Sequence, residues 1–123
     1  MTPGREYIDH LKDILDAIEK AEQFTEGMDF EKFSVDYKTR FAVIRALEII
    51  GEASKKIPET VKRQNPNLPW REITGIRDIL IHEYFGLNLK VIWKTLKEDF
   101  PVLKPAISAM LEKAILQSNV SQT

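Results

Sequence analysis

The residues best suited to proton transfer lie together in the stretch GIRDILIHEYFG, residues 75–86. It holds Arg77, Asp78, His82 and Tyr84 among mostly apolar residues, and His82 is one of two histidines in the chain. Imidazole titrates near neutral pH, so it can take up or release a proton. Asp78 precedes His82 by four residues. At this helical spacing its carboxylate can accept a hydrogen bond from the ring, fix the tautomer and favour the cationic form.

The pattern around these residues predicts one helix over residues 70–85 that ends before a glycine. At about 100° per residue, a polar strip runs along this helix and consists of Arg71, Gly75, Asp78 and His82. Arg77 lies about 140° from His82 on the same helix, at the edge of the apolar face. Gly75 leaves an opening where another chain or a phosphate can approach closely.

Spacing alone leaves simpler interpretations open. The pair of His82 and Asp78 is also typical of a solvated helix surface, where it contributes a few tenths of a kcal/mol. Arg77 can cover apolar surface with its stem, and Tyr84 can be a half-buried core aromatic.

Helical periodicity extends over the rest of the chain. We expect further helices over residues 7–24, 36–56 and 89–100, the last of these with Asn88 as its N-cap. We also expect short helical turns near 30–34 and between 57 and 69, and a final helix capped at 99. Asp99 would cap the last helix, with Pro101 and Pro105 in its first turn. No segment alternates with period two for long enough to predict a strand. The sequence therefore predicts an all-α, single-domain antiparallel helical bundle over residues 1–117, followed by a polar, frayed tail at 118–123.

Composition excludes several classes of site. The chain has no cysteine, and its two histidines, His10 and His82, are far apart, so we predict no disulfide, no thiolate chemistry, no metal site and no cofactor. Neither a signal peptide nor a membrane span is predicted, which favours a cytoplasmic protein.

Charge is distributed unevenly along the chain. Residues 1–33 hold four Lys/Arg and nine Asp/Glu, whereas residues 38–97 hold twelve and six. A polyanionic partner should therefore meet the middle of the chain. The apolar residues of segment 36–56 cover more than one face of the predicted helix, which indicates burial against a second surface such as a partner subunit.

Arg77, His82 and Tyr84 have the spacing RX4HXY, and this chain resembles the HepT-like ribonuclease toxins of the HEPN superfamily, which carry that motif. The segments EIIGEASKKIP (48–58), LPWREITGIRDILIHEYFG (68–86) and VIWKTLKEDFPVLKPAI (91–107) resemble the characteristic segments of the family in order. The resemblance covers nearly the whole chain. One difference is Asp78, because asparagine is common after the arginine of the motif.

The resemblance implies a two-fold homodimer in which two motifs form a composite, metal-independent endoribonuclease site. Arg77 and His82 would be catalytic, the ribose 2′-hydroxyl of the RNA would attack, and Asp78 and Tyr84 would support them. The resemblance also implies a toxin–antitoxin pair. The partner would be a minimal nucleotidyltransferase antitoxin that uses ATP to transfer AMP to Tyr84.

Five basic residues are candidates for contacts to the RNA backbone: Lys55, Lys56, Lys62, Arg63 and Arg71. Ordinary solvated charges are the alternative for each of them. Two other functions also stay open, namely a non-catalytic module that binds RNA or a nucleotide, and a helical module that docks the antitoxin. The presence of both Arg77 and His82 favours the enzyme, because a docking surface needs no titratable base beside a cation.

Overall fold

Amphipathic helices form nearly all of the chain that is described by the computed structural model, which covers residues 5–82 and 89–121 and the side chains of 7–76 and 89–119. In chain order the elements are α1 (Arg5–Phe24), α2 (Phe30–Val35), α3 (Tyr37–Lys55), α4 (Glu59–Gln64), α5 (Trp70–His82), α6 (Leu89–Lys94), the π-helical turn η1 (Thr95–Asp99) and α7 (Phe100–Ser121). These ranges contain no strand, so the all-α prediction is confirmed.

Short polar side chains set the starts of two helices. The carboxylate of Asp29 accepts a hydrogen bond from the backbone N–H of Lys32 at 2.8 Å and begins α2. Asp36 does the same for Thr39 at 3.1 Å and begins α3. Such caps satisfy backbone donors that have no partner within the helix. Asp36 therefore separates α2 from α3 and lets the chain change direction there.

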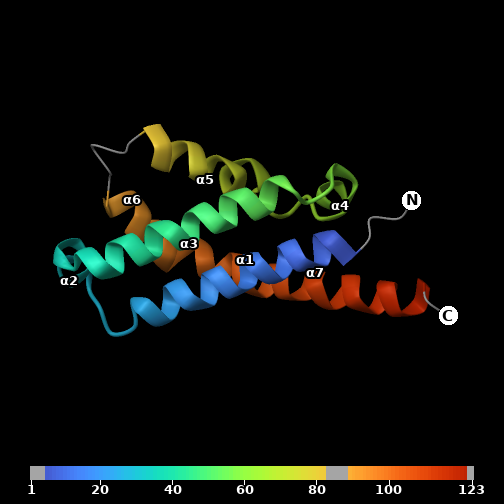
Figure 1. Ribbon diagram of the computed structural model, residues 1–123, viewed down its shortest axis with the longest axis horizontal. Coiled ribbons are helices and arrows are strands. Elements are labelled where there is room, and N and C mark those ends of the chain that lie inside the picture. Colours follow the sequence, from blue (N-terminus) through green and yellow to red (C-terminus); the bar gives the residue numbers. More distant parts are fainter. Residues whose placement is uncertain (1–4, 83–88, 122–123) are drawn as a thin grey trace.

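The long helices form an antiparallel bundle in which α3 occupies the middle (Figure 1). α3 packs between α1 and α5, and α7 packs against α1. The core is a single cluster that includes Leu11, Ile14, Leu47, Ile50 and Ile107. Across the bundle, Lys104 Nζ of α7 donates to Glu22 Oε1 of α1 at 2.9 Å.

The central position of α3 explains most of its wide apolar surface, because helices of the same chain cover it from two sides. Two aromatic side chains near its start remain outside this packing. Tyr37 is 68% exposed and Phe41 is 69% exposed. Burial against a partner subunit therefore stays a prediction for these two residues and is not needed for the rest of the helix.

The predicted boundary at Asp99 was wrong. α6, η1 and α7 follow one another directly, and the N–H of Phe100 bonds to the carbonyl of Thr95, five residues back. This wider turn lies just before Pro101, whose ring would otherwise meet the carbonyl four residues earlier. Leu96, Phe100 and Leu103 are buried on one stripe through the turn. Burial of that stripe keeps the helix continuous, although Pro101 and Asp99 favour a new helix start at this point.

Two further expectations for this segment differ from the structure. Pro105 lies inside α7 and not in its first turn. The helix also extends through Ser121, so residues 118–121 are helical where we expected a frayed tail. Among the described helices, none is both long and apolar enough to cross a membrane.

Candidate functional site

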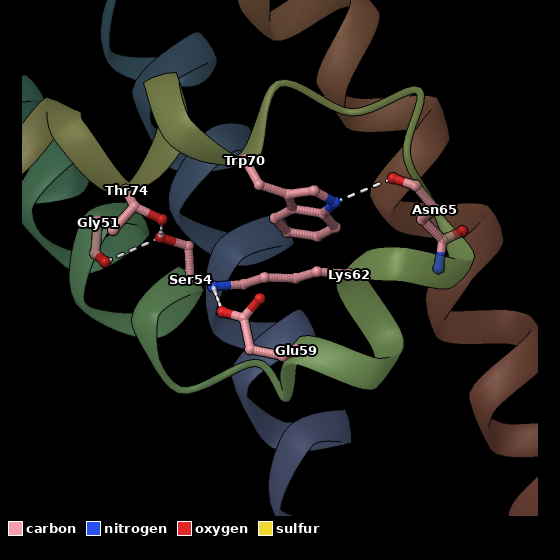
Figure 2. A network of polar contacts seen from close by, with 7 residues as sticks. All are labelled: Gly51, Ser54, Glu59, Lys62, Asn65, Trp70 and Thr74. Atoms are coloured by element: carbon pink, nitrogen blue, oxygen red, sulfur yellow. Dashed lines mark hydrogen bonds and ion pairs between the residues drawn. The ribbon is translucent and has the colours of Figure 1, made fainter.

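The start of α5 is fixed by the loop that follows α4. The indole Nε1 of Trp70 donates to the carbonyl of Asn65 at 2.9 Å (Figure 2). The Trp70 backbone N–H bonds to the carbonyl of Leu68, also at 2.9 Å. Ile73, one turn later, is 2% exposed and anchors this turn in the core. The helix that carries the predicted motif is thus held at its first turn by both polar and apolar contacts.

A second contact ties α5 to α3 through two hydroxyl groups. Ser54 is fully buried, and its Oγ donates to the carbonyl of Gly51 at 2.9 Å. The same Oγ lies 3.3 Å from Oγ1 of Thr74 (Figure 2). A serine hydroxyl has one proton, which Ser54 gives to Gly51, so Thr74 must be the donor in the second bond. Thr74 precedes Arg77 by three residues, so this tether holds α5 one turn before the motif.

The α5 backbone is helical from Trp70 to His82, which places Arg77, Asp78 and His82 on one helix. Positions 78 and 82 are about 40° apart around the axis, and positions 77 and 82 are about 140° apart. The side chains of these residues lie outside those described. Tyr84, the predicted AMP acceptor, lies outside the described residues altogether.

A groove of about 670 Å³ lies between α4 and α5. Its lining residues are Glu59, Lys62, Arg63, Trp70, Arg71, Thr74 and Gly75. Three of the five predicted RNA contacts, Lys62, Arg63 and Arg71, therefore come together on this surface. The other two, Lys55 and Lys56, are exposed at the end of α3 and do not line the groove.

The three basic residues of the groove have different environments. The side chain of Lys62 is 12% exposed; its Nζ lies 3.8 Å from the carboxylate of Glu59 and 5.8 Å from the centre of the Trp70 ring (Figure 2). Arg63 and Arg71 are exposed, and neither makes an ion pair within the part of the chain that the structure describes. The charge of Lys62 is therefore largely buried beside Glu59 of its own helix and Trp70 of α5, whereas both arginines are exposed and available to an anion.

Sequence reasoning did not find the roles of Ser54, Thr74 and Trp70. Helical spacing places Trp70 among the apolar residues of α5, and its ring also forms part of the groove wall. The sequence does contain a signal for this tether. Gly51 and Ser54 are small residues three positions apart on α3, and this spacing lets a second helix approach closely.

The chain is similar to known proteins over most of its length. A family model described as "Ribonuclease HepT-like" matches residues 14–110. The chain is 59% identical over 100 residues to "Probable ribonuclease HepT" of Thermococcus cleftensis, a match that covers 81% of this chain and 91% of that protein. A protein of Methanocaldococcus jannaschii named "Putative RNase" is 45% identical over 97 residues, which cover 79% of this chain and 89% of that protein.

A further protein with the name "Putative RNase", from Caldanaerobacter subterraneus subsp. tengcongensis, is 40% identical over 113 residues. That match covers 92% of this chain and 98% of the relative. No solved structure matches the chain.

Proposed function

The chain belongs to the HepT-like ribonuclease family, and from this premise we propose that it is a metal-independent endoribonuclease and the toxin of a toxin–antitoxin pair. One observation carries the catalytic part of the proposal. Arg71 and Gly75 line a basic groove, and Asp78 and His82 continue the same strip of α5 at helical spacing. An RNA strand held in the groove would therefore lead to the proposed base.

The reaction needs no nucleophile from the protein. His82 would take the proton of a ribose 2′-hydroxyl, whose oxygen attacks the adjacent phosphorus while the bond to the 5′-oxygen of the next nucleotide breaks. The leaving oxygen would take up a proton, and the products would carry a 2′,3′-cyclic phosphate and a 5′-hydroxyl. Arg77 would stabilise the charge on the phosphate oxygens, and Asp78 would orient the imidazole. Tyr84 would donate a hydrogen bond to the phosphate.

The helix geometry supports a composite site in a homodimer. A separation of about 140° makes it difficult for one α5 helix to aim both Arg77 and His82 at one phosphate. A two-fold axis would bring a second pair opposite the first. The exposed rings of Tyr37 and Phe41 are candidates for part of the interface.

This arrangement predicts that dimerisation and activity are lost together. Phe41→Glu should shift the protein to a monomer in sedimentation velocity and remove cleavage, although the motif itself is unchanged. A fully active monomer would refute the composite site.

A minimal nucleotidyltransferase is the proposed antitoxin. The oxygen of Tyr84 would attack the α-phosphorus of ATP, so that a bond to AMP forms, pyrophosphate leaves and the phenolic proton is released. The bulky anion would then block the site and repel RNA. Because this regulation would use ATP, we expect it to act in the cytoplasm.

The direct test is cleavage of an end-labelled RNA by the purified protein in EDTA. His82→Ala should lower the rate by about 10²- to 10⁴-fold, the usual contribution of general acid–base catalysis. His10→Ala, which changes the only other histidine, is the matched control and should cleave like the parent. Products that end in 2′,3′-cyclic phosphate would support attack by the 2′-hydroxyl. A folded dimer that cleaves none of a varied set of RNAs would instead indicate a module that binds RNA or a nucleotide, or docks the antitoxin.

A further inference from the structure

The groove between α4 and α5 has two parts with different properties. On one side, the largely buried side chain of Lys62 lies between the carboxylate of Glu59 and the ring of Trp70 and forms a wall of the groove. On the other side, Arg63 and Arg71 present guanidinium groups to solvent with no ion pair among the described residues. Guanidinium groups match phosphate oxygens with a planar fork of donors. The free positive charge of the groove is thus concentrated on these two arginines.

Gly75 keeps one end of this groove open. A β-carbon placed at this position would meet no heavy atom of the described residues within 4 Å, so none of them fills the space beside the backbone. Gly75 is half-buried in the groove wall and lies seven residues before His82, two turns along the same strip of α5. A ligand that passes this glycine can follow the helix surface toward the motif.

We propose that the α4–α5 groove is the path by which single-stranded RNA reaches the site, with successive phosphates on Arg63 and Arg71 and the strand passing over Gly75 toward His82. This inference rests on the proposed function and assigns it a substrate class. Lys62 supports the groove wall and does not contact the strand. Lys55 and Lys56 lie outside the path, so three of the five basic candidates are separated from the two that bind.

The dimensions of the groove favour a single strand over a duplex. Double-stranded RNA is usually bound over about 16 base pairs, through contacts that span two minor grooves. The groove of about 670 Å³ is formed by seven residues of two helices, one of them only six residues long. A surface of this extent suits a few nucleotides of one strand. Contacts through phosphates also predict little dependence on base identity.

The first test measures RNA binding without cleavage. In the full-length His82→Ala protein, fluorescence anisotropy would follow the binding of a short fluorescein-labelled oligouridylate at salt concentrations from about 50 to 500 mM. Each phosphate contact to a single strand contributes about 0.7 to the slope of log K against log salt. Arg63→Gln with Arg71→Gln should therefore lower the slope by about 1.4 and weaken binding about 25-fold at about 0.1 M salt.

A matched control changes the same net charge elsewhere. Lys12→Gln with Lys113→Gln removes two exposed charges from α1 and α7, and α3 lies between α1 and α5 (Figure 1). This variant should bind with the parental salt slope. If both double variants lower the slope equally, the effect is one of general charge and the groove assignment is overturned.

Side chains at position 75 test the path by size and not by charge. Gly75→Leu should weaken binding more than Gly75→Ala, because the longer side chain fills the opening. Both residues favour a helix, so circular dichroism should show equal folding. Equal binding by the two variants would overturn the path.

The outcomes separate this inference from the proposed function. If the parent protein cleaves RNA in a manner that depends on His82 but the arginine variant keeps the parental salt slope, the groove assignment fails and the proposed function stands. If the arginine variant shows the expected decrease in salt slope but the parent cleaves no RNA, the groove binds RNA and the proposed function fails. A lower slope together with cleavage that depends on His82 supports both. A duplex of matched length that binds as tightly as the single strand would overturn the substrate class.

Discussion

Replacing Thr74 with valine removes the hydroxyl that ties α5 to α3 and keeps the shape of the side chain. Thr74 Oγ1 lies 3.3 Å from Ser54 Oγ and, from the proton count, is the donor in that bond. Ser54 is fully buried, so no water can replace the lost donor without a change in packing. The variant should therefore lower stability and loosen the helix that carries the motif.

The magnitude follows from the position of the bond. A hydrogen bond between neutral groups contributes about 0.5–1.5 kcal/mol to stability, and a separation of 3.3 Å, which is long for two hydroxyl groups, suggests a value in the lower part of that range, about 0.5–1 kcal/mol. For a chain of this size, that free energy corresponds to a fall of about 2–4 °C in Tm. Thr74→Ser keeps the donor and should retain most of the coupling to Ser54.

The assay is a double-mutant cycle by urea unfolding at one fixed protein concentration, since association would shift apparent stability. Ser54→Ala and Thr74→Val should be less destabilising together than the sum of the two single changes, by about 0.5–1 kcal/mol. Thr60→Val, at an exposed threonine of α4, is the control and should change stability by less than about 0.5 kcal/mol. Additive effects of the two changes would refute the tether.

Three further predictions concern the helices that support this site. The backbone N–H of Thr39 lowers the pKa of Asp36, so the cap stabilises the fold above the unfolded pKa of about 3.8, and this contribution is lost as the pH falls through the lower folded value. Asp36→Asn should keep the cap but remove that pH dependence, and a parental stability curve at acid pH would contradict the assignment. The hydrogen bond to Glu22 raises the pKa of Lys104, so the contribution of this pair to stability is present below about pH 10.5 and is lost as the pH rises through the folded value. Lys104→Gln should reduce the loss of stability at alkaline pH, and a parental stability curve at alkaline pH would argue against the pair in solution. Pro105→Ala should raise the free energy of unfolding by about 1 kcal/mol or more, because alanine restores a backbone donor inside α7 and removes a strong helix breaker. If denaturant unfolding shows that the variant is less stable than the parent, the proline ring itself packs favourably.

The helices could be predicted from sequence because their signals are local. Apolar spacing gave the start and end of α1 within two residues, and Asp36 marked the start of α3 through a cap that needs only nearby residues. The prediction failed at Asp99, where local signals favoured a new helix. Pro101 and a good capping residue meet there, yet burial of Leu96, Phe100 and Leu103 against the rest of the bundle keeps the helix continuous. That burial depends on residues far away in the chain and has no local signal.

For the candidate site, the sequence by itself determined the family and the order of Arg77, Asp78 and His82 along one helix, since these depend only on residue identity and spacing. Only the tertiary structure decided which basic residues are available to RNA. Lys62 and Arg63 are neighbours in sequence with the same charge, but one lies between Glu59 and Trp70 and the other faces solvent. Trp70 comes from the next helix. A side chain's exposure and pairing are set by the elements packed around it, and the sequence around the residue does not specify them.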